Sequence, residues 1–450
     1  MKQSSLSTNT FKILTSAIEA VSAPRLIANN FSASSTGLIV SDLHFDWDAI
    51  RRLVVVGFGK ASGAMAESLE KALDARPPSI PLTGWINVPD EDRSSCRDIH
   101  IHHARPTGEN LPTERAFDGT REIIKLTEGL EEDDLCFVLV SGGGSALLTQ
   151  PAANISLTDK RATIKRLAAE GATIEQLNLI RQHLSEVKGG GLASRAKAGR
   201  VVALIISDVL GDPLEFIASG PTVQVPFQPQ RAIETFHHLD IELESIPESV
   251  RLHLVSQCAE PKREFLFPTA TCNPTNVIVG SMTKAVEAAC AAAQTLGFEV
   301  STRIQTNPFE DVETVANQMV DLIGKPIEQP HCFIDGGEPI LKLCSAPGRG
   351  GRNQQLVMSV IEKLLNGPEC NQKFELVSAG TDGEDGNTPI AGAMIDDIGV
   401  SELRSSMFNP APFLASNDAF SFFNQSRYAV STGPTSTNVG DLRILIRFPR

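Results

Sequence analysis

Short apolar runs alternate along this chain with stretches of helical periodicity. Residues 53–56, 136–140 and 201–206 are apolar at every position, and a helical pattern follows the first run at 62–73. Runs that are apolar throughout are typical of strands covered on both faces, as in a parallel sheet between helices. Because strand–helix alternation is the pattern of βαβ units, the first part of the chain is predicted to be a Rossmann-like α/β domain with a largely parallel sheet.

A proline-rich stretch, from Pro221 to about Pro261, interrupts this alternation. A second series of apolar runs with one alanine-rich helical pattern then follows, at 277–279, 283–296, 300–303, 332–334, 376–377 and 444–446. Prolines between periodic segments are typical of connections. We therefore predict two domains, an N-terminal α/β domain of residues 1–265 and a second α/β domain of residues 266–450.

The N-terminal segment allows two interpretations. Residues 1–30 are rich in Ser and Thr and contain three cations against the single acid Glu19, a composition shared with transit peptides. Residues 11–21 also place apolar side chains at helical spacing and continue into the domain without a cleavage-like boundary. The pattern favours an amphipathic first helix over a targeting segment.

Composition narrows the class of partner. The net charge of −14, with only two Trp and one Tyr in 450 residues, argues against a nucleic-acid partner, which would be repelled and would lack stacking platforms. The eight cysteines form no C-x-x-C pair and no zinc-ligand pattern, and no run reaches the length of a membrane span. We predict a cytoplasmic protein with small-molecule partners.

Ligands of open α/β sheets bind outside the carboxyl ends of the strands, so the loops after the apolar runs are the candidate sites. The first loop, residues 57–63, reads Gly-Phe-Gly-Lys-Ala-Ser-Gly. Glycines let the backbone approach a phosphate, and Lys60 adds a cation next to a helix start. The spacing matches neither the dinucleotide fingerprint nor a Walker loop. Gly59, Lys60 and Ser62 are predicted phosphate-binding residues, the alternative being a structural turn.

A second loop contains three successive glycines between a buried strand and a helix. Its sequence is Ser141-Gly142-Gly143-Gly144-Ser145. Consecutive N–H groups beside two hydroxyls suit an anion. We predict that residues 142–145 bind one, the alternative being a flexible turn.

Residues 174–188 are predicted to form a helix that Thr173 and Gln176 cap at its start. Four polar positions recur at helical spacing beside its apolar stripe, namely Asn178, Arg181, Ser185 and Lys188. A solvated face is the usual fate of such residues. The pattern by itself does not choose Arg181 and Lys188 over other surface cations.

Charged residues follow other predicted strands. Asp208 and Asp212 come directly after the run 201–206, where two carboxylates suit a Mg²⁺ ion or a hydroxyl proton, although Asp212 also suits a helix cap. Arg349 and Arg352 lie among glycines at a predicted helix start, which favours anion binding. The acidic loop 381–386 lacks the terminal glutamate of an EF-hand.

Glycine-rich and cationic loops with carboxylates nearby match the requirements of phosphoryl transfer. The motifs together resemble those of the glycerate 2-kinase family, whose members carry a C-terminal MOFRL-type domain, and the resemblance runs from about residue 10 to the C-terminus. The stretches that carry it are VGFGKAS (56–62), SGGGSALL (141–148), IRQHLSEVKGG (180–190), SDVLGDPLEFIASGPT (207–222), DGGEP (335–339), GRGGRNQQ (348–355), SAGTDGEDG (378–386) and TGPTSTNVGDLR (432–443).

The resemblance implies ATP-dependent phosphorylation of D-glycerate at its 2-hydroxyl, giving 2-phosphoglycerate and ADP with Mg²⁺, by a monomer or homodimer. It implies that Lys60 and Arg352 are catalytic cations, Lys60 acting on the transferring phosphoryl group and Arg352 on substrate or phosphate charge. Asp208 is expected to position the metal or the attacking hydroxyl. Arg181, Lys188 and Arg349 are expected to bind phosphate or substrate.

The chain departs from the family pattern at 103–107, at 280–283 and at Gln182. These departures bear on the acceptor and its pocket more than on the reaction class. Two alternatives stay open. The first is an NAD(P)H-dependent hydroxypyruvate reductase, for which Asp90 is the best ribose-binding carboxylate. The second is a non-catalytic ligand-binding paralogue.

Overall fold

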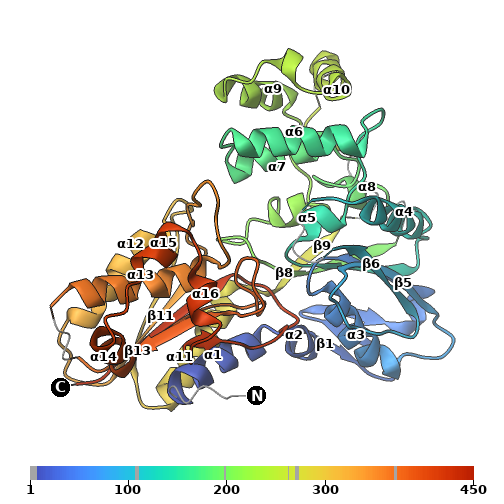
Figure 1. Cartoon of the computed structure of the whole chain (residues 1–450). Coiled ribbons are helices and arrows are strands. Elements are labelled where there is room, and N and C mark those ends of the chain that lie inside the picture. The colour runs from blue at the N-terminus through green and yellow to red at the C-terminus, as the bar shows by residue number, and fades with distance from the viewer. Residues whose placement is uncertain are drawn as a thin grey trace. The chain divides into compact units, whose positions relative to one another are not determined.

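The computed structural model describes residues 8–106, 111–196, 199–261, 263–268, 273–368 and 372–449. The chain divides into two compact units. The first unit is Leu26–Val279. The second unit combines the residues up to Arg25 with Gly280–Arg450. Each unit is built around its own six-stranded sheet (Figure 1).

The sheet of the first unit has the order β6-β5-β4-β7-β8-β9. The pairs among β4 to β8 are all parallel, which confirms the predicted Rossmann-like α/β fold. The chain starts in the middle at β4 and winds outward in both directions, so the order reverses between β4 and β7. The strands are β4 (Arg52–Phe58), β5 (Leu82–Pro89), β6 (Ile99–Arg105), β7 (Asp134–Val140), β8 (Arg200–Ile206) and β9 (Thr275–Gly280).

Helices α3 and α4 lie on opposite faces of this sheet (Figure 1). Helices α6, α7, α9 and α10 stack as a separate helical layer of the same unit, with a small core of its own. A short antiparallel sheet, β1-β2-β3, completes the unit. The remaining elements are α2 (Ala23–Asn30), β1 (Phe31–Ala33), β2 (Gly37–Val40), β3 (Leu43–Asp46), α3 (Ser62–Ala72), α4 (Glu114–Glu128), α5 (Gly144–Leu147), α6 (Leu157–Ala169), α7 (Ile174–His183), α8 (Gly191–Ser194), α9 (Pro229–His238) and α10 (Glu248–Ala259).

The sheet of the second unit has the order β10-β11-β15-β12-β13-β14. Only β10 and β11 pair in parallel; the other described pairs are antiparallel. Its strands are β10 (Glu299–Ile304), β11 (His331–Gly337), β12 (Phe374–Gly380), β13 (Gly392–Asp396), β14 (Ala429–Val430) and β15 (Asp441–Arg447). Its helices are α1 (Thr8–Ala20), α11 (Met282–Thr295), α12 (Val312–Gly324), α13 (Arg352–Asn366), α14 (Asp397–Ser405), α15 (Ala411–Ala415) and α16 (Ala419–Phe423).

The unit boundaries differ from the division at residue 265 that the prolines suggested. The run 277–279, which we assigned to the second series, is β9 and lies beside β8 in the first sheet. The predicted first helix is present as α1, but it packs on α11 and β15 of the second unit, with Ile13 and Leu14 fully buried. We assigned both elements to the wrong unit because we grouped them with their neighbours in the sequence. Each element packs against apolar residues that are far away along the chain.

The predicted helix 174–188 is too long. The capping box of Thr173 and Gln176 is present, but α7 ends at His183. Beyond it the chain turns away from the helix, with Ser185 bridged to Pro151 and the Leu184 carbonyl accepting from the Ala152 N–H at 3.1 Å. Ser185 and Lys188 therefore do not share a helical face with Asn178, and all three are buried rather than solvated.

Asp335 on β11 is a buried ionic centre of the second unit. Its carboxylate accepts from Arg303 at 2.8 Å and from the fully buried Arg443 at 2.6 Å. We expect Asp335→Ala to lower the free energy of unfolding by about 3–5 kcal/mol, because it leaves a buried guanidinium without its counter-ion. Urea unfolding should separate this variant from Asp321→Ala, an exposed control on α12; equal stabilities would contradict the expectation.

Candidate functional site

The loops after β4 and β7 meet at the edge of the first sheet where the strand order reverses. Phe58 and Val140, the last residues of these strands, are paired in register. The Lys60 N–H donates to the Gly142 carbonyl at 2.9 Å, so the two predicted loops lie in direct contact. Such a reversal point is where open α/β sheets bind their ligands.

Ser62 holds the two loops together and does not face an open site. Its side chain is fully buried, with its hydroxyl 3.1 Å from the Ser141 hydroxyl and 3.2 Å from the Leu139 carbonyl. The Ser141 hydroxyl also accepts from the Ala61 N–H at 3.0 Å. The arrangement indicates a structural role for Ser62.

The 142–144 loop presents backbone donors between two cations. The N–H groups of Gly142 and Gly143 form no hydrogen bond with any described residue. A Cβ atom at Gly143 would lie 3.5 Å from Lys60 Cγ and 3.8 Å from Arg105 Nη2. Two successive amides beside a lysine and an arginine form a concave site that suits phosphate oxygens. We refer to Lys60, Arg105, Gly142 and Gly143 as the phosphate cradle.

Arg105 was not among the predicted site residues. It is the last residue of β6 and is almost fully buried, so its guanidinium is held at the same edge of the sheet as Lys60. The available signal was a cation at the end of a strand. We overlooked this signal because the histidines of β6 interrupt the apolar pattern of the strand.

Gly59 has no room for a side chain. Its φ is +140°, and a Cβ atom there would lie 2.2 Å from Ser141 Oγ. We expect Gly59→Ala to lower the free energy of unfolding by about 2 kcal/mol or more, since a disfavoured backbone conformation is combined with a clash. Gly171→Ala is a matched control, with φ of +81° but nothing within 4 Å, and should cost about 1 kcal/mol. Urea unfolding of both variants checks this, and equal losses would contradict it.

A hydrogen-bond network of hydroxyl, amide and backbone carbonyl groups, joined by Lys188, continues from the 142–145 loop into the helical layer. The Ser145 hydroxyl lies 2.9 Å from the Ser219 hydroxyl, which donates to Asn178 Oδ1 at 2.7 Å. Lys188 Nζ donates to the carbonyls of Ser145 at 3.0 Å and Ala218 at 3.3 Å. Gly144 packs tightly, because a Cβ there would lie 2.9 Å from Ala218 Cβ.

Burial lowers the pKa of Lys188 well below its ordinary value, and the charges of Lys160 and Arg181 lower it further. Burial also lowers the pKa of Arg181. The structure thus brings the predicted Arg181 and Lys188 together and adds Lys160 on α6, which sequence reasoning missed.

Asp208 and Asp212 lie in one turn after β8. Both are half-buried, and Asp212, with φ of +56°, closes the turn through its N–H to the Val209 carbonyl at 3.0 Å. Within the described ranges no group of three or more His, Cys, Asp or Glu side chains is placed to hold a metal. Asp212 does not cap a helix, because no helix starts at the residues that follow it.

In the second unit, Arg352 is the first residue of α13 and is held by two carboxylates. Its Nε and Nη2 donate to Asp441, and Nη2 also lies 2.9 Å from Glu338 Oε1. Burial alone would lower the pKa of Arg352, but Asp441 and Glu338 raise it above its ordinary value. Nη1 forms no hydrogen bond with any described residue, so it can donate to a bound anion.

Arg349, in the loop before α13, is exposed and lies over the Phe420 ring at 4.4 Å, while its N–H donates to Asp418 at 3.0 Å.

Asp385 lies at the start of α13 and accepts from the N–H groups of Asn353 at 3.0 Å and Gln354 at 2.8 Å. This residue of the acidic loop therefore caps a helix. Burial raises the pKa of Asp385 to about 6, against the effect of those donors.

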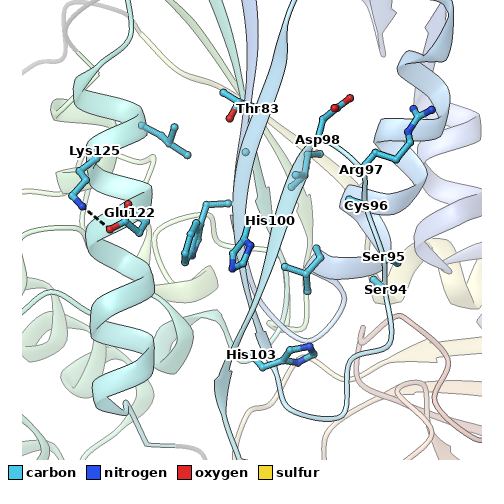
Figure 2. Close-up of a pocket in the computed structure, with 15 residues that line it drawn as sticks. Thr83, Ser94, Ser95, Cys96, Arg97, Asp98, His100, His103, Glu122 and Lys125 are labelled. Carbon is cyan, nitrogen blue, oxygen red and sulfur yellow. Dashed lines mark hydrogen bonds and ion pairs between the residues drawn. The ribbon is translucent and has the colours of Figure 1, made fainter.

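A separate pocket of about 740 Å³ lies along β5 and β6 beside α4 (Figure 2). None of the predicted site residues lines it. Its charged groups include Glu122 and Lys125, which pair with each other at 2.6 Å. The lining follows the length of the strands, away from the sheet edge that carries the phosphate cradle.

Sequence and structure comparisons agree on the family. Residues 9–255 match the family described as Domain of unknown function (DUF4147), and residues 331–441 match the MOFRL family. Glycerate kinase of Rattus norvegicus is 33% identical over 98% of this chain and 92% of its own length. Glycerate 2-kinase of Pyrococcus horikoshii is 32% identical, over 97% of this chain and 96% of its own length. This chain belongs to the glycerate kinase family.

Solved structures from the family have the same fold. A glycerate kinase from Thermotoga maritima superposes with a TM-score of 0.79 at 29% identity, over 97% of this chain and 98% of its own. A protein from Pyrococcus horikoshii OT3 gives a TM-score of 0.78 at 31% identity, over 98% of both chains. The resemblance drawn from the motifs is confirmed. Among the described residues, no helix has the length and apolarity of a membrane span.

Two carboxylates of this glycerate kinase family member bear on the dinucleotide-binding alternative. Asp90, the candidate ribose ligand, is bound through both oxygens by Arg115, at 2.9 and 2.8 Å. A Cβ atom at Gly63, in the first turn of α3, would lie 2.6 Å from both Asp92 oxygens. A dinucleotide places its pyrophosphate at that helix start, and Asp92 lies there, with a pKa that burial raises.

Proposed function

We propose that this protein is an ATP-dependent kinase that phosphorylates the 2-hydroxyl of D-glycerate and releases 2-phosphoglycerate and ADP. The observation that carries the proposal is the phosphate cradle, in which two amides that bond to no described residue lie beside Lys60 and Arg105 at the reversal point of the sheet. Catalysis of phosphoryl transfer is mainly positioning and charge stabilisation, which this arrangement supplies.

Each site residue of the first unit has its own role in the proposed reaction. The Gly142 and Gly143 amides orient phosphate oxygens, and Lys60 neutralises the charge on the transferring phosphoryl group. Arg105, whose guanidinium is held in place by burial, supplies the second cation that binds the phosphate. Asp208, at the end of the neighbouring strand β8, accepts the proton of the attacking hydroxyl or holds it in place.

A Mg²⁺ ion fits the donors that are present. Mg²⁺ is commonly held by one or two carboxylates together with substrate phosphates and water, so the single turn containing Asp208 and Asp212 is sufficient without a larger acidic cluster. Asp208 is the ligand we propose, with Asp212 as a second. When bound, the ion would neutralise phosphate charge.

Arg352 acts on substrate or phosphate charge through Nη1, because Asp441 and Glu338 occupy its other edge. Arg349 adds an exposed cation to the same loop. We further propose a cytoplasmic monomer or homodimer. The cysteines in the described part of the chain are all unbridged, as expected in a reducing compartment.

The test is ATP consumption by purified protein with D-glycerate and Mg²⁺, with the product detected through enolase, which accepts 2-phosphoglycerate. Enolase-dependent signal supports the proposal, and 3-phosphoglycerate as the product contradicts the 2-hydroxyl assignment. A change in NADH absorbance with hydroxypyruvate, without coupling enzymes, would favour the reductase instead. Nucleotide binding without turnover on any hydroxy acid would indicate a non-catalytic paralogue.

A further inference from the structure

Three cations lie in and beside the helical layer of the first unit, and none of them forms an ion pair with a described carboxylate. Lys160 lies on α6, Arg181 on α7, and Lys188 in the segment after α7. Lys160 and Lys188 are 3% and 1% exposed. Lys160 Nζ has no hydrogen-bond partner, and Arg181 forms no hydrogen bond or ion pair with any described residue. We refer to these three residues as the cation cluster.

The charges lie close enough to affect one another. Burial and the charge of Arg181 lower the pKa of Lys160 to about 7. Burial, Lys160 and Arg181 together lower the pKa of Lys188. Like charges enclosed in this way destabilise the protein unless an anion joins them, since buried charges are normally paired.

The groups packed around Lys160 supply no such anion. Its helix is packed by α7 and α10, whose other charged or titratable side chains are Glu175, His183, Glu248, Arg251, His253 and Cys258. None of these affects the pKa of Lys160, and only Arg181 does. The neighbouring Asp159 carboxylate accepts from the Ser249 hydroxyl at 2.7 Å and forms no described ion pair with Lys160.

We propose that Lys160, Arg181 and Lys188 bind the carboxylate of the phosphoryl acceptor, with Lys160 as a specificity-determining residue. The inference rests on the proposed function. Lys188 also donates to the Ser145 carbonyl at 3.0 Å, so the cation cluster adjoins the loop whose amides form the phosphate cradle. A hydroxy acid held here by its carboxylate directs its hydroxyl toward that loop.

Burial favours a small carboxylate over a triphosphate in this position. With two of the three side chains almost fully buried, the cluster has little surface open to a long polyanion. The guanidinium of Arg181 offers the planar fork that binds carboxylates through two oxygens. A phosphate group of the nucleotide has similar charge chemistry, and the experiment below separates the two sources.

The test compares wild type, Lys160→Met and Lys165→Met, an exposed lysine on the same helix as a matched control. Calorimetric titration with D-glycerate at pH 8.5, in two buffers of different ionisation heat, should show proton uptake by wild type. Lys160 is mostly neutral at that pH and becomes protonated when the anion binds. Lys160→Met should bind D-glycerate at least tenfold more weakly and with a smaller proton uptake, since only Lys188, whose pKa is also lowered, is left to take up a proton, while Lys165→Met should match wild type.

Steady-state kinetics identify the source of the anion. We expect the KM for D-glycerate to rise at least tenfold in Lys160→Met, with the KM for ATP within twofold of wild type. A rise in the KM for ATP alone would overturn the assignment to the acceptor. An unchanged affinity of Lys160→Met for D-glycerate would overturn the anion site altogether.

Thermal melting without anion should show Lys160→Met at least as stable as wild type, because a buried cation has been removed. A lower melting midpoint of Lys160→Met with unchanged binding would mean that Lys160 is a structural lysine.

The failure of this inference and that of the proposed function have different outcomes. If wild type turns over D-glycerate and Lys160→Met does so equally well, the inference is wrong and the kinase assignment stands. If wild type shows no kinase turnover but binds D-glycerate with Lys160-dependent proton uptake, the carboxylate site stands and the kinase assignment is wrong.

Discussion

Lys60→Ala is expected to lower kcat with D-glycerate by on the order of 10³-fold while the protein stays folded. Lys60 is half-buried beside Gly143 and Arg105, where a cation is worth more than in water, and its charge has to match the charge that develops on the phosphoryl group. Because the transition state carries more charge at that point than the bound substrates, the loss should appear in kcat more than in either KM. Coupled-assay kinetics at saturating ATP and D-glycerate measure it.

Two further variants make the Lys60 prediction specific. Lys71→Ala removes an exposed lysine of α3, whose Nζ pairs with Glu67 at 2.7 Å, and should leave kcat within twofold. Arg105→Ala, which removes the other cation of the phosphate cradle, should lower kcat as well. A Lys60→Ala enzyme with near-normal turnover would contradict the assignment of this lysine to the phosphoryl group.

Arg352→Met is expected to lower kcat by on the order of 10²- to 10³-fold and also to destabilise the second unit. The substitution leaves the buried Asp441 carboxylate without its counter-ion. Because the Arg352 side chain is 34% exposed, the loss of unfolding free energy should be about 2 kcal/mol, below that of a fully buried pair. Urea unfolding and the coupled assay give the two effects separately.

The double variant Arg352→Met/Asp441→Asn separates the two roles. Removing the charge of Asp441 as well should restore most of the lost stability, because no buried charge is left alone. Turnover should stay low, since the cation is still missing. If the double variant regained wild-type kcat, Arg352 would be a structural residue and its catalytic assignment would be wrong.

The strands and most helices could be predicted from the sequence because their signals are local. Runs such as 136–140 and 201–206 have no polar position, and only a strand covered on both faces buries them completely. The strand order, with its reversal between β4 and β7, is seen only in the structure. That the loops at this reversal bind an anion stays a prediction.

The features that could not be predicted from the sequence depend on contacts between residues far apart along the chain. Helix α7 ends early because Ser185 bridges to Pro151, and no local pattern around His183 records that contact. Lys160 did leave a local signal, since it falls among Leu157, Ile164 and Leu167 on the apolar face of α6. A lysine within an apolar stripe indicates a buried cation, and attention to the glycine loops caused this one to be missed.

The placement of α1 has a consequence for how the chain is made. The helix leaves the ribosome before Leu26–Val279, but its packing partners include β15, which is translated after the whole of that unit. The inserted unit holds nearly all of its own sheet and can fold co-translationally, as domains generally do. Throughout that time Ile13 and Leu14, fully buried in the finished protein, have no native surface to pack against. The nascent chain therefore carries an exposed amphipathic segment ahead of the inserted unit, a natural target for a ribosome-associated chaperone.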